Sequence, residues 1–277
     1  MADLGIAAVN PNKALWEKGD FTRIAATMRE SGEELVARLG IRPGMRVLDL
    51  GSGDGTTALP AASRGAEVLA IDIAENLVAA GNARAAAAGL DKIRFFEGDA
   101  ARLTGIPQMS VDLVVSIFGA MFAPRPYDVA REMVRVTRSG GRIVMGNWIP
   151  GDDTLVAQIL RISAAYTPPP PAGFVSPMCW GDPDQVSQRF AAASIPAADL
   201  TFERASWTFR RPGPPSELLD IFRRYYGPTM NAFEAAERIG MADELYAELL
   251  DLFERENRGG ANTVIPATYL RVIVDRK

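Results

Sequence analysis

Short apolar runs alternate with helical patterns through the first half of the chain. The apolar runs predict buried strands at 45–50, 67–71, 93–96, 111–117 and 142–146. Amphipathic or alanine-rich stretches predict three helices. One ends near residue 64, the second covers 74–88 and the third covers 127–137. Strands that are apolar throughout are typical of a sheet with helices on both faces. The alternation therefore predicts a doubly wound α/β fold with a mostly parallel sheet.

The pattern becomes less regular after residue 148. It predicts helices at 153–166 and 182–193, a strand at 200–209, a broken helical stretch over 212–257 and a last strand at 269–274. The two added strands bring the expected sheet to seven. We expect one α/β domain over 41–277, with insertions at 150–180 and 211–260 that form a helical cap.

The N-terminal segment, residues 1–40, is expected to be a helical lid. A helical pattern runs from Lys13 to Gly40. Ser31 and Glu34 have the spacing of a capping box, which predicts Ser31 as a helix N-cap. Trp16 is a candidate for a side chain that closes over a site, although an indole in an amphipathic helix is more often a packing residue.

A glycine cluster follows the first predicted strand and precedes a helix. Gly51, Gly53 and Gly55 let the backbone approach a ligand closely, and the helix N-terminus adds free amides. Asp72 and Asp99 end the next two predicted strands. In open α/β sheets, ligands bind at the carboxyl ends of the strands. An acidic side chain at the end of the second strand can accept hydrogen bonds from ribose hydroxyls, so a nucleotide-like ligand is expected.

Two other nucleotide-binding loops fit this segment less well. A phosphate-binding loop requires Gly-Lys-Ser/Thr, and no lysine follows these glycines. A dinucleotide fingerprint requires Gly-x-Gly-x-x-Gly, whereas the spacing here is shorter. Asp49 and Asp54 flank the loop, which disfavours a pyrophosphate and favours a sulfonium or ammonium group.

The amino-acid composition excludes several kinds of catalytic and metal site. The chain has 277 residues with no histidine and one cysteine, Cys179, so histidine-based triads, zinc sites and internal disulfides are excluded, and no metal is expected. The net charge of −4 disfavours nucleic-acid binding. The N-terminus lacks the pattern of a signal peptide and no apolar run is long enough to span a membrane, so a cytoplasmic protein is expected.

The segment 47–55, Val-Leu-Asp-Leu-Gly-Ser-Gly-Asp-Gly, resembles motif I of class I S-adenosylmethionine-dependent methyltransferases. The resemblance extends in order through 70–73, 96–100, 112–116 and 136–142, and covers roughly 42–148. It is closest in character to the small-molecule branch that includes the methyltransferases of ubiquinone and menaquinone biosynthesis. It implies S-adenosyl-L-methionine as cofactor and S-adenosyl-L-homocysteine as product.

The resemblance also implies a set of cofactor-binding residues, namely Asp49, Gly51, Ser52, Gly53, Asp72, Ile73, Asp99, Ala100 and Ser116. Asp72 would hold the ribose, Ile73 would lie against the adenine, and Asp99 would take the adenine amine. Ser116, at the end of the fourth strand, would approach the methionine end. Asp72 is expected to face solvent, so that its replacement by alanine would weaken cofactor binding without unfolding the protein.

The acceptor side is expected beyond the fourth and fifth strands, where the sequence supplies Phe118, Met121, Phe122 and Trp148, with Phe174, Met178, Trp180, Tyr225 and Tyr226 added from the cap. Of these, Phe118, Met121, Trp148 and Tyr225 are the predicted acceptor-binding residues. Such a lining suits a small apolar or aromatic molecule. The Ser-Ile-Phe-Gly at 116–119 departs from the Asp/Asn-Pro-Pro-aromatic motif of nucleic-acid-base methyltransferases. The sequence identifies no general base, and transfer by in-line displacement can rest largely on positioning.

Two other functions stay open at this point. A nicotinamide-dependent oxidoreductase would use a related fold, although the loop spacing disfavours it. A catalytically silent module that only binds the cofactor would keep the same strand-end residues.

Overall fold

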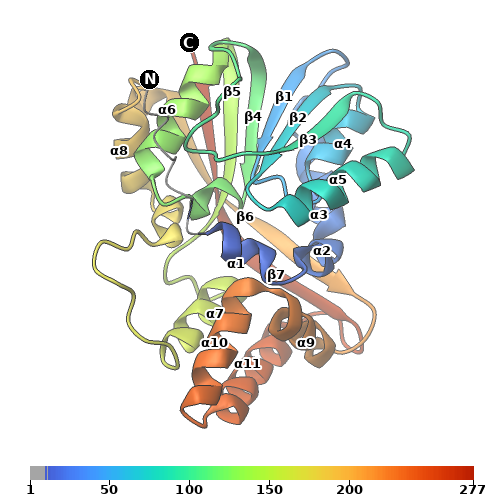
Figure 1. Cartoon of the computed structure of the whole chain (residues 1–277), viewed down its shortest axis with the longest axis vertical. Coiled ribbons are helices and arrows are strands. Elements are labelled where there is room, and N and C mark those ends of the chain that lie inside the picture. The colour runs from blue at the N-terminus through green and yellow to red at the C-terminus, as the bar shows by residue number, and fades with distance from the viewer. Residues whose placement is uncertain (1–9, 11) are drawn as a thin grey trace, which may run out of the picture.

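The computed structural model describes residue 10 and residues 12–277, so that residues 1–9 and 11 of the expected lid lie outside the described part. A single sheet of seven strands forms the centre of the molecule, in the order β3-β2-β1-β4-β5-β7-β6 (Figure 1). The strands are β1 (Arg46–Leu50), β2 (Glu67–Asp72), β3 (Ile93–Glu97), β4 (Val111–Ile117), β5 (Thr137–Trp148), β6 (Leu200–Arg211) and β7 (Thr263–Arg276).

The strand directions confirm the predicted fold class. β3, β2, β1, β4 and β5 pair in parallel, and only β7 runs antiparallel to its neighbours β5 and β6. β7 is longer than expected, because it starts at Thr263 and pairs with β6 from there to Val274, with Pro266 opposite Thr208. Proline usually ends a strand because it lacks an N–H, and here the pairing continues past it.

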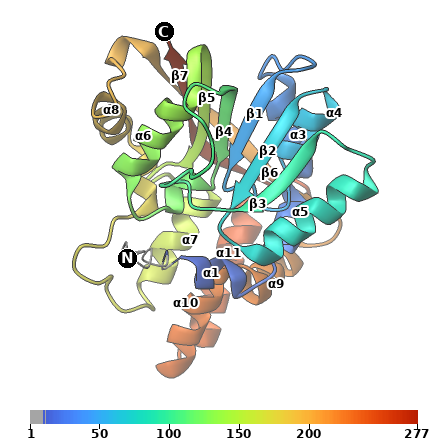
Figure 2. The same ribbon diagram turned by 45° about the horizontal axis from the view of Figure 1, so that its top comes forward.

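Helices cover both faces of the sheet. One group lies beside β1, β2 and β3, and another lies beside β4 and β5 (Figures 1 and 2). The first group is α3 (Arg29–Ala37), α4 (Ala58–Ser63) and α5 (Glu75–Ala87), and the second is α6 (Pro126–Val136) and α8 (Pro183–Ala191). No helix in the described part of the chain is long and apolar enough to cross a membrane.

Four more helices pack against one another below one end of the sheet (Figure 1). They are α7 (Leu155–Ala164), α9 (Pro215–Tyr225), α10 (Gly227–Arg238) and α11 (Ala242–Glu256). They come from the segment after β5 and the segment between β6 and β7. We refer to these four helices as the cap.

The N-terminal segment is divided into short helices. These are α1 (Lys13–Glu17), α2 (Phe21–Ala25) and α3, with Asp20 accepting a hydrogen bond from the Thr22 N–H at the start of α2. The prediction of Ser31 as an N-cap is wrong, since α3 begins at Arg29 and Ser31 lies inside it. The Ser31 hydroxyl donates to the Thr208 carbonyl at 3.1 Å and accepts from the Thr208 N–H at 3.0 Å. Ser31 therefore joins α3 to the edge strand β6.

We expect Ser31→Ala to lower the free energy of unfolding by about 1–2 kcal/mol, because it removes the hydroxyl that partners both the N–H and the carbonyl of Thr208 in an edge strand. Urea denaturation followed by circular dichroism measures this change. Ser139→Ala, at an exposed position of β5, is the matched control and should leave stability unchanged. Equal stability of the two variants would contradict a structural role for Ser31.

Candidate functional site

A cavity opens at the carboxyl ends of the parallel strands, between the sheet, the N-terminal helices and the cap. One half, the glycine-loop half, is bounded by the loop after β1 and by the ends of β2 and β3. The other half, the aromatic half, is lined by Phe118, Trp148, Val156, Ile159, Leu160, Trp207, Phe209, Phe222 and Tyr226. The cavity thus joins the loop that the sequence singles out to a wall of apolar rings.

The glycine loop is held against the loop after β4 with no space between them. Gly51 has a φ of 64° and Gly53 a φ of 55°, a region that favours glycine. A Cβ added at Gly51 would lie 2.4 Å from the Cα of Gly119. Sequence reasoning missed Gly119, because nothing local shows that these two loops touch.

Asp72 lines the cavity from the end of β2, but it is buried rather than solvent-facing as expected. Its carboxylate accepts hydrogen bonds from the Gly53 N–H at 2.8 Å and the Ala74 N–H at 3.0 Å. Burial raises the pKa of Asp72, and these two N–H groups act in the opposite direction. The carboxylate therefore shapes the glycine loop as well as facing the cavity.

Asp49 lies beneath the glycine loop and does not line the cavity. The Thr57 hydroxyl donates to its Oδ2, while Oδ1 is buried with no hydrogen-bond partner among the described residues. Burial raises the pKa of Asp49 to about 7, and the Thr57 hydroxyl lowers it in part. The nearby charge of Asp72 also contributes to this raised pKa.

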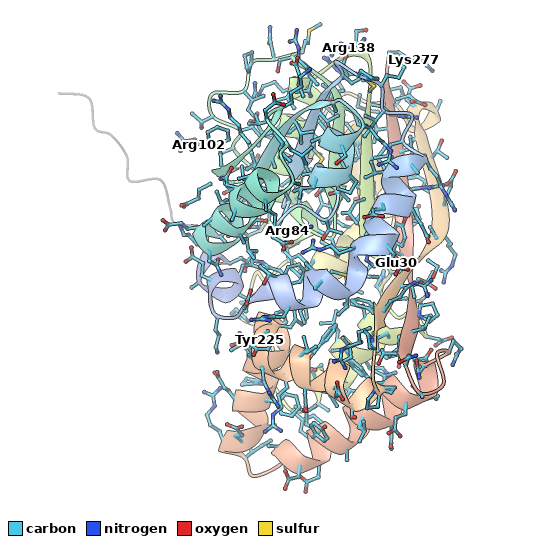
Figure 3. The ribbon with its side chains drawn as sticks, turned by 90° about the vertical axis from the view of Figure 1, so that its right-hand side faces the viewer. Glu30, Arg84, Arg102, Arg138, Tyr225 and Lys277 are labelled. Atoms are coloured by element: carbon cyan, nitrogen blue, oxygen red, sulfur yellow. The ribbon has the colours of Figure 1, made fainter. Side chains whose placement is uncertain are left out.

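Asp54 also lies at the loop and is buried, but it has positively charged partners. Arg29 of α3 forms an ion pair and hydrogen bond with its Oδ2, and Arg84 of α5 lies 3.6 Å from Oδ1. Figure 3 shows Arg84 beside the N-terminal helices. The expectation that the Asp54 charge would favour a cationic ligand is wrong, because two guanidinium groups neutralise it.

The other expected cofactor residues divide into those that line the cavity and one that supports it. Ser52, Ile73, Asp99 and Ala100 line the glycine-loop half, together with Gly51 and Gly53. The Ser52 hydroxyl is buried without a partner among the described residues. Asp99 accepts a hydrogen bond from the Ala101 N–H at 2.8 Å.

Ser116 does not line the cavity. Its hydroxyl donates to the Leu50 carbonyl at 2.7 Å and accepts from the Ala120 N–H at 2.9 Å. It therefore ties the end of β1 to the segment after β4, which is a different position from the one expected at a methionine end.

Phe118 forms the centre of the aromatic half. It has a φ of 56°, which is rare for a bulky residue and marks local strain. Its ring stacks on Trp148 with a centroid distance of 3.7 Å and meets the edge of Trp207 at 5.2 Å. Met121 is buried nearby but is absent from the cavity wall, because it packs in the core of the domain.

Tyr225 lies outside the cavity, and Tyr226 lines it instead. Helix α9 ends at Tyr225, and the extended conformation of Tyr226 (φ −96°, ψ 107°) points consecutive side chains in different directions. The Arg23 guanidinium lies 5.9 Å from the centre of the Tyr225 ring, at the boundary of the N-terminal helices and the cap (Figure 3). The prediction that Tyr225 lines the acceptor side is therefore wrong, and Tyr226 lines it. The helical pattern alone could not decide between these two neighbours.

The N-terminal helices cover the cavity with aromatic side chains. Trp16 lines it and packs edge-on against Phe21 at 5.6 Å and Phe122 at 4.8 Å. Tyr226 lies 6.0 Å from Trp16 and 6.1 Å from Phe21. Phe21 lies against Gly53, so this cluster extends from the cap to the glycine loop.

Comparison with known proteins matches residues 48–145 to a methyltransferase domain family. An uncharacterised protein of Mycobacterium tuberculosis is 37% identical over 248 residues, which are 89% of this chain and 88% of that protein. Demethylmenaquinone methyltransferase of Beutenbergia cavernae is 38% identical over 110 residues, 40% of this chain and 43% of that enzyme. The crystal structure of the YcgJ protein from Bacillus subtilis has the same fold, with a TM-score of 0.54 and 19% identity, over 90% of this chain and 99% of that one.

Asp49 should make the stability of the ligand-free protein fall as the pH rises. Its pKa in the folded protein is about 7, against 3.8 as the ordinary value, so the folded state holds a proton that the unfolded state releases. The stabilising effect of that proton is complete below about pH 4 and is lost as the pH rises to about 7. We expect Asp49→Asn to be more stable than the natural protein at pH 8 and to show a smaller loss between pH 5 and pH 8.

Denaturation in urea at the two pH values measures this difference. Asp91→Asn, in an exposed loop before β3, is the control and should retain the pH dependence of the natural protein. A pH dependence that Asp49→Asn leaves unchanged would show that the buried carboxyl group is not its source.

Proposed function

We propose that this chain, which belongs to the class I S-adenosylmethionine-dependent methyltransferases, methylates a small apolar or aromatic molecule. The single observation that carries the proposal is the continuity of the cavity, which joins the glycine loop to the aromatic half without an intervening wall. A donor bound on the loop and an acceptor bound among the rings would therefore be in contact.

The glycine-loop half fits S-adenosylmethionine in its donor set. We infer that Gly51, Ser52 and Gly53 hold the methionine part and that Asp72 accepts hydrogen bonds from the ribose hydroxyls. Ile73, Asp99 and Ala100 would surround the adenine. The Ser52 hydroxyl, which lines the cavity and is buried without a partner among the described residues, supports a polar ligand at this place. The bound cofactor supplies an activated methyl group on a positively charged sulfur.

The aromatic half supports an apolar acceptor. Its rings form a connected series, with Phe222 5.8 Å from Phe209 and 5.3 Å from Tyr226. The demethylmenaquinone methyltransferase among the relatives is named for a ring-bearing acceptor, which agrees with this proposal. The chain's contribution would be to align the two molecules and to exclude water with the N-terminal helices and the cap.

Three expectations from the sequence remain part of this proposal. The net charge of −4 supports a small molecule rather than a nucleic acid as the acceptor. Residues 1–40 would act as a lid, and the segments 150–180 and 211–260 as cap insertions in the domain 41–277. We propose the cytoplasm as the place of action.

A thermal melt with added ligands tests cofactor binding. We expect S-adenosylmethionine and S-adenosylhomocysteine at about 100 times their dissociation constants to add ~2.7 kcal/mol, which raises the melting temperature by roughly 5–10 °C. NAD should cause no shift. A shift with NAD alone would replace the proposal by an oxidoreductase, and no shift with either sulfur compound would reject cofactor binding.

Asp72→Asn should weaken S-adenosylmethionine binding by about tenfold or more, because a charged acceptor of ribose hydrogen bonds becomes neutral. Asparagine keeps the volume of the side chain and an oxygen for one of the two N–H groups, so it disturbs this buried position less than alanine does. Isothermal titration calorimetry measures the dissociation constant. Asp153→Asn, which is exposed, is the matched control, and the same affinity in both variants would refute the role of Asp72.

A further inference from the structure

We propose that the aromatic half binds its methyl acceptor as an anion, a phenolate or thiolate already formed in solution, with the Tyr226 hydroxyl and the Trp207 indole N–H donating hydrogen bonds to the anionic atom. This inference rests on the proposed function, since it assigns the chemical class of the acceptor at the same site.

The polar atoms of the aromatic half are hydrogen-bond donors. Among its lining side chains, only Trp148, Trp207 and Tyr226 carry polar atoms, and an indole N–H can only donate. The Trp207 Nε1 is buried with no hydrogen-bond partner among the described residues. Burying a hydrogen-bond donor without an acceptor lowers the stability of the folded protein, and a ligand atom that accepts the hydrogen bond would remove this penalty. The wall is therefore complementary to an electron-rich oxygen or sulfur.

Among the described residues that line the aromatic half, none has a side chain able to remove a proton near neutral pH. Tyr226 is its one ionisable side chain among the described lining residues, and burial raises the pKa of this phenol, so it stays neutral. The carboxylates that line the cavity, Asp54, Asp72 and Asp99, belong to the glycine-loop half and are engaged by Arg29 and Arg84 or by backbone N–H groups. We therefore infer that an acceptor with an O–H or S–H group loses its proton before it binds.

The charged residues on the elements around Tyr226 have other partners and do not line the cavity. Each of them contacts a carboxylate or ring outside the aromatic half. Lys13 pairs with Glu97 and Glu17, Lys18 with Glu234, Arg23 with Asp20 and the Tyr225 ring, Arg224 with Asp220, and Arg223 lies over the Phe233 and Tyr246 rings and near Glu237. No lysine or arginine among the described residues lines the cavity, so the positive charge of the cofactor would be the counter-charge to a bound anion.

The transfer balances without a protein base. A lone pair of the anionic acceptor atom forms the new bond to the methyl carbon, and the electron pair of the methyl–sulfur bond remains on the sulfur. The acceptor becomes a neutral ether or thioether, and no proton has to leave the closed cavity. A site without a base is consistent with this sequence of events.

Binding of 4-nitrophenol tests the inference without turnover, because its absorption spectrum distinguishes the phenolate from the phenol. The protein is first saturated with sinefungin, which carries an amine in place of the sulfonium, or with S-adenosylhomocysteine, which carries no charge at the sulfur. We expect the sinefungin complex to bind the phenolate at least about tenfold tighter and to lower the apparent pKa of the bound probe. 4-Nitroanisole, which has no ionisable proton, is the matched control ligand and should bind the two complexes with equal affinity.

Tyr226→Phe removes one donor and keeps the ring. We expect it to weaken binding of the phenolate by about tenfold or more and to leave the affinity for sinefungin unchanged. Tyr225→Phe, one residue away and outside the cavity, is the matched control and should change neither. Trp207→Phe should weaken phenolate binding in the same direction.

Several results would overturn the inference. These are binding of 4-nitrophenol as the neutral phenol, equal affinity in the two complexes, or no binding by a protein that does bind sinefungin. Equal affinity of Tyr226→Phe and Tyr225→Phe for the phenolate would show that the Tyr226 hydroxyl does not bind the anionic atom. A protein that binds neither sinefungin nor S-adenosylhomocysteine would instead reject the proposed function itself, so the two failures are distinguishable.

Discussion

The backbone contact between Gly51 and Gly119 is the constraint on which both halves of the cavity depend. Any side chain at Gly51 would clash with the Gly119 backbone, which follows the neighbouring parallel strand. Ser116 strengthens the same junction through the Leu50 carbonyl and the Ala120 N–H. The contact fixes the loop that faces one half and, one residue before Gly119, sets Phe118 in the conformation that stacks it on Trp148 in the other.

The strands and the strand-end residues could be predicted because they follow from local pattern and a general rule of open sheets. Gly51, Gly53 and Asp72 meet at one edge, since carboxyl ends of parallel strands share it. Ser31 could not be placed, because hydrogen bonds to Thr208, distant in sequence, override a local capping pattern. Tyr226 depends on where α9 ends, a boundary that helical periodicity does not fix to one residue.

The buried carboxyl groups near the glycine loop differ in the hydrogen bonds and ion pairs that offset their negative charge. Asp54 has Arg29 and Arg84, whereas Asp49 has the Thr57 hydroxyl and the Ala58 backbone N–H, and Asp72 has backbone N–H groups. Burial raises the pKa of both Asp49 and Asp72, so negative charge on these two groups lowers the stability of the folded chain. A positively charged ligand would offset that cost. No ion pair offsets Asp72 among the described residues, so this carboxylate in the cavity wall would favour the cationic cofactor proposed above.

The contacts of the N-terminal helices suggest how the cavity closes. The ion pairs of Lys13 with Glu97 and of Lys18 with Glu234 lie near the surface, where such pairs contribute little to stability. The aromatic contacts of Trp16 with Phe21 and Phe122 are the stronger interaction. Because these rings belong to the cavity wall, a ligand that fills the aromatic half adds contacts to the same cluster. Binding of the acceptor and closure over it should therefore reinforce each other, which would keep water away from the bound acceptor.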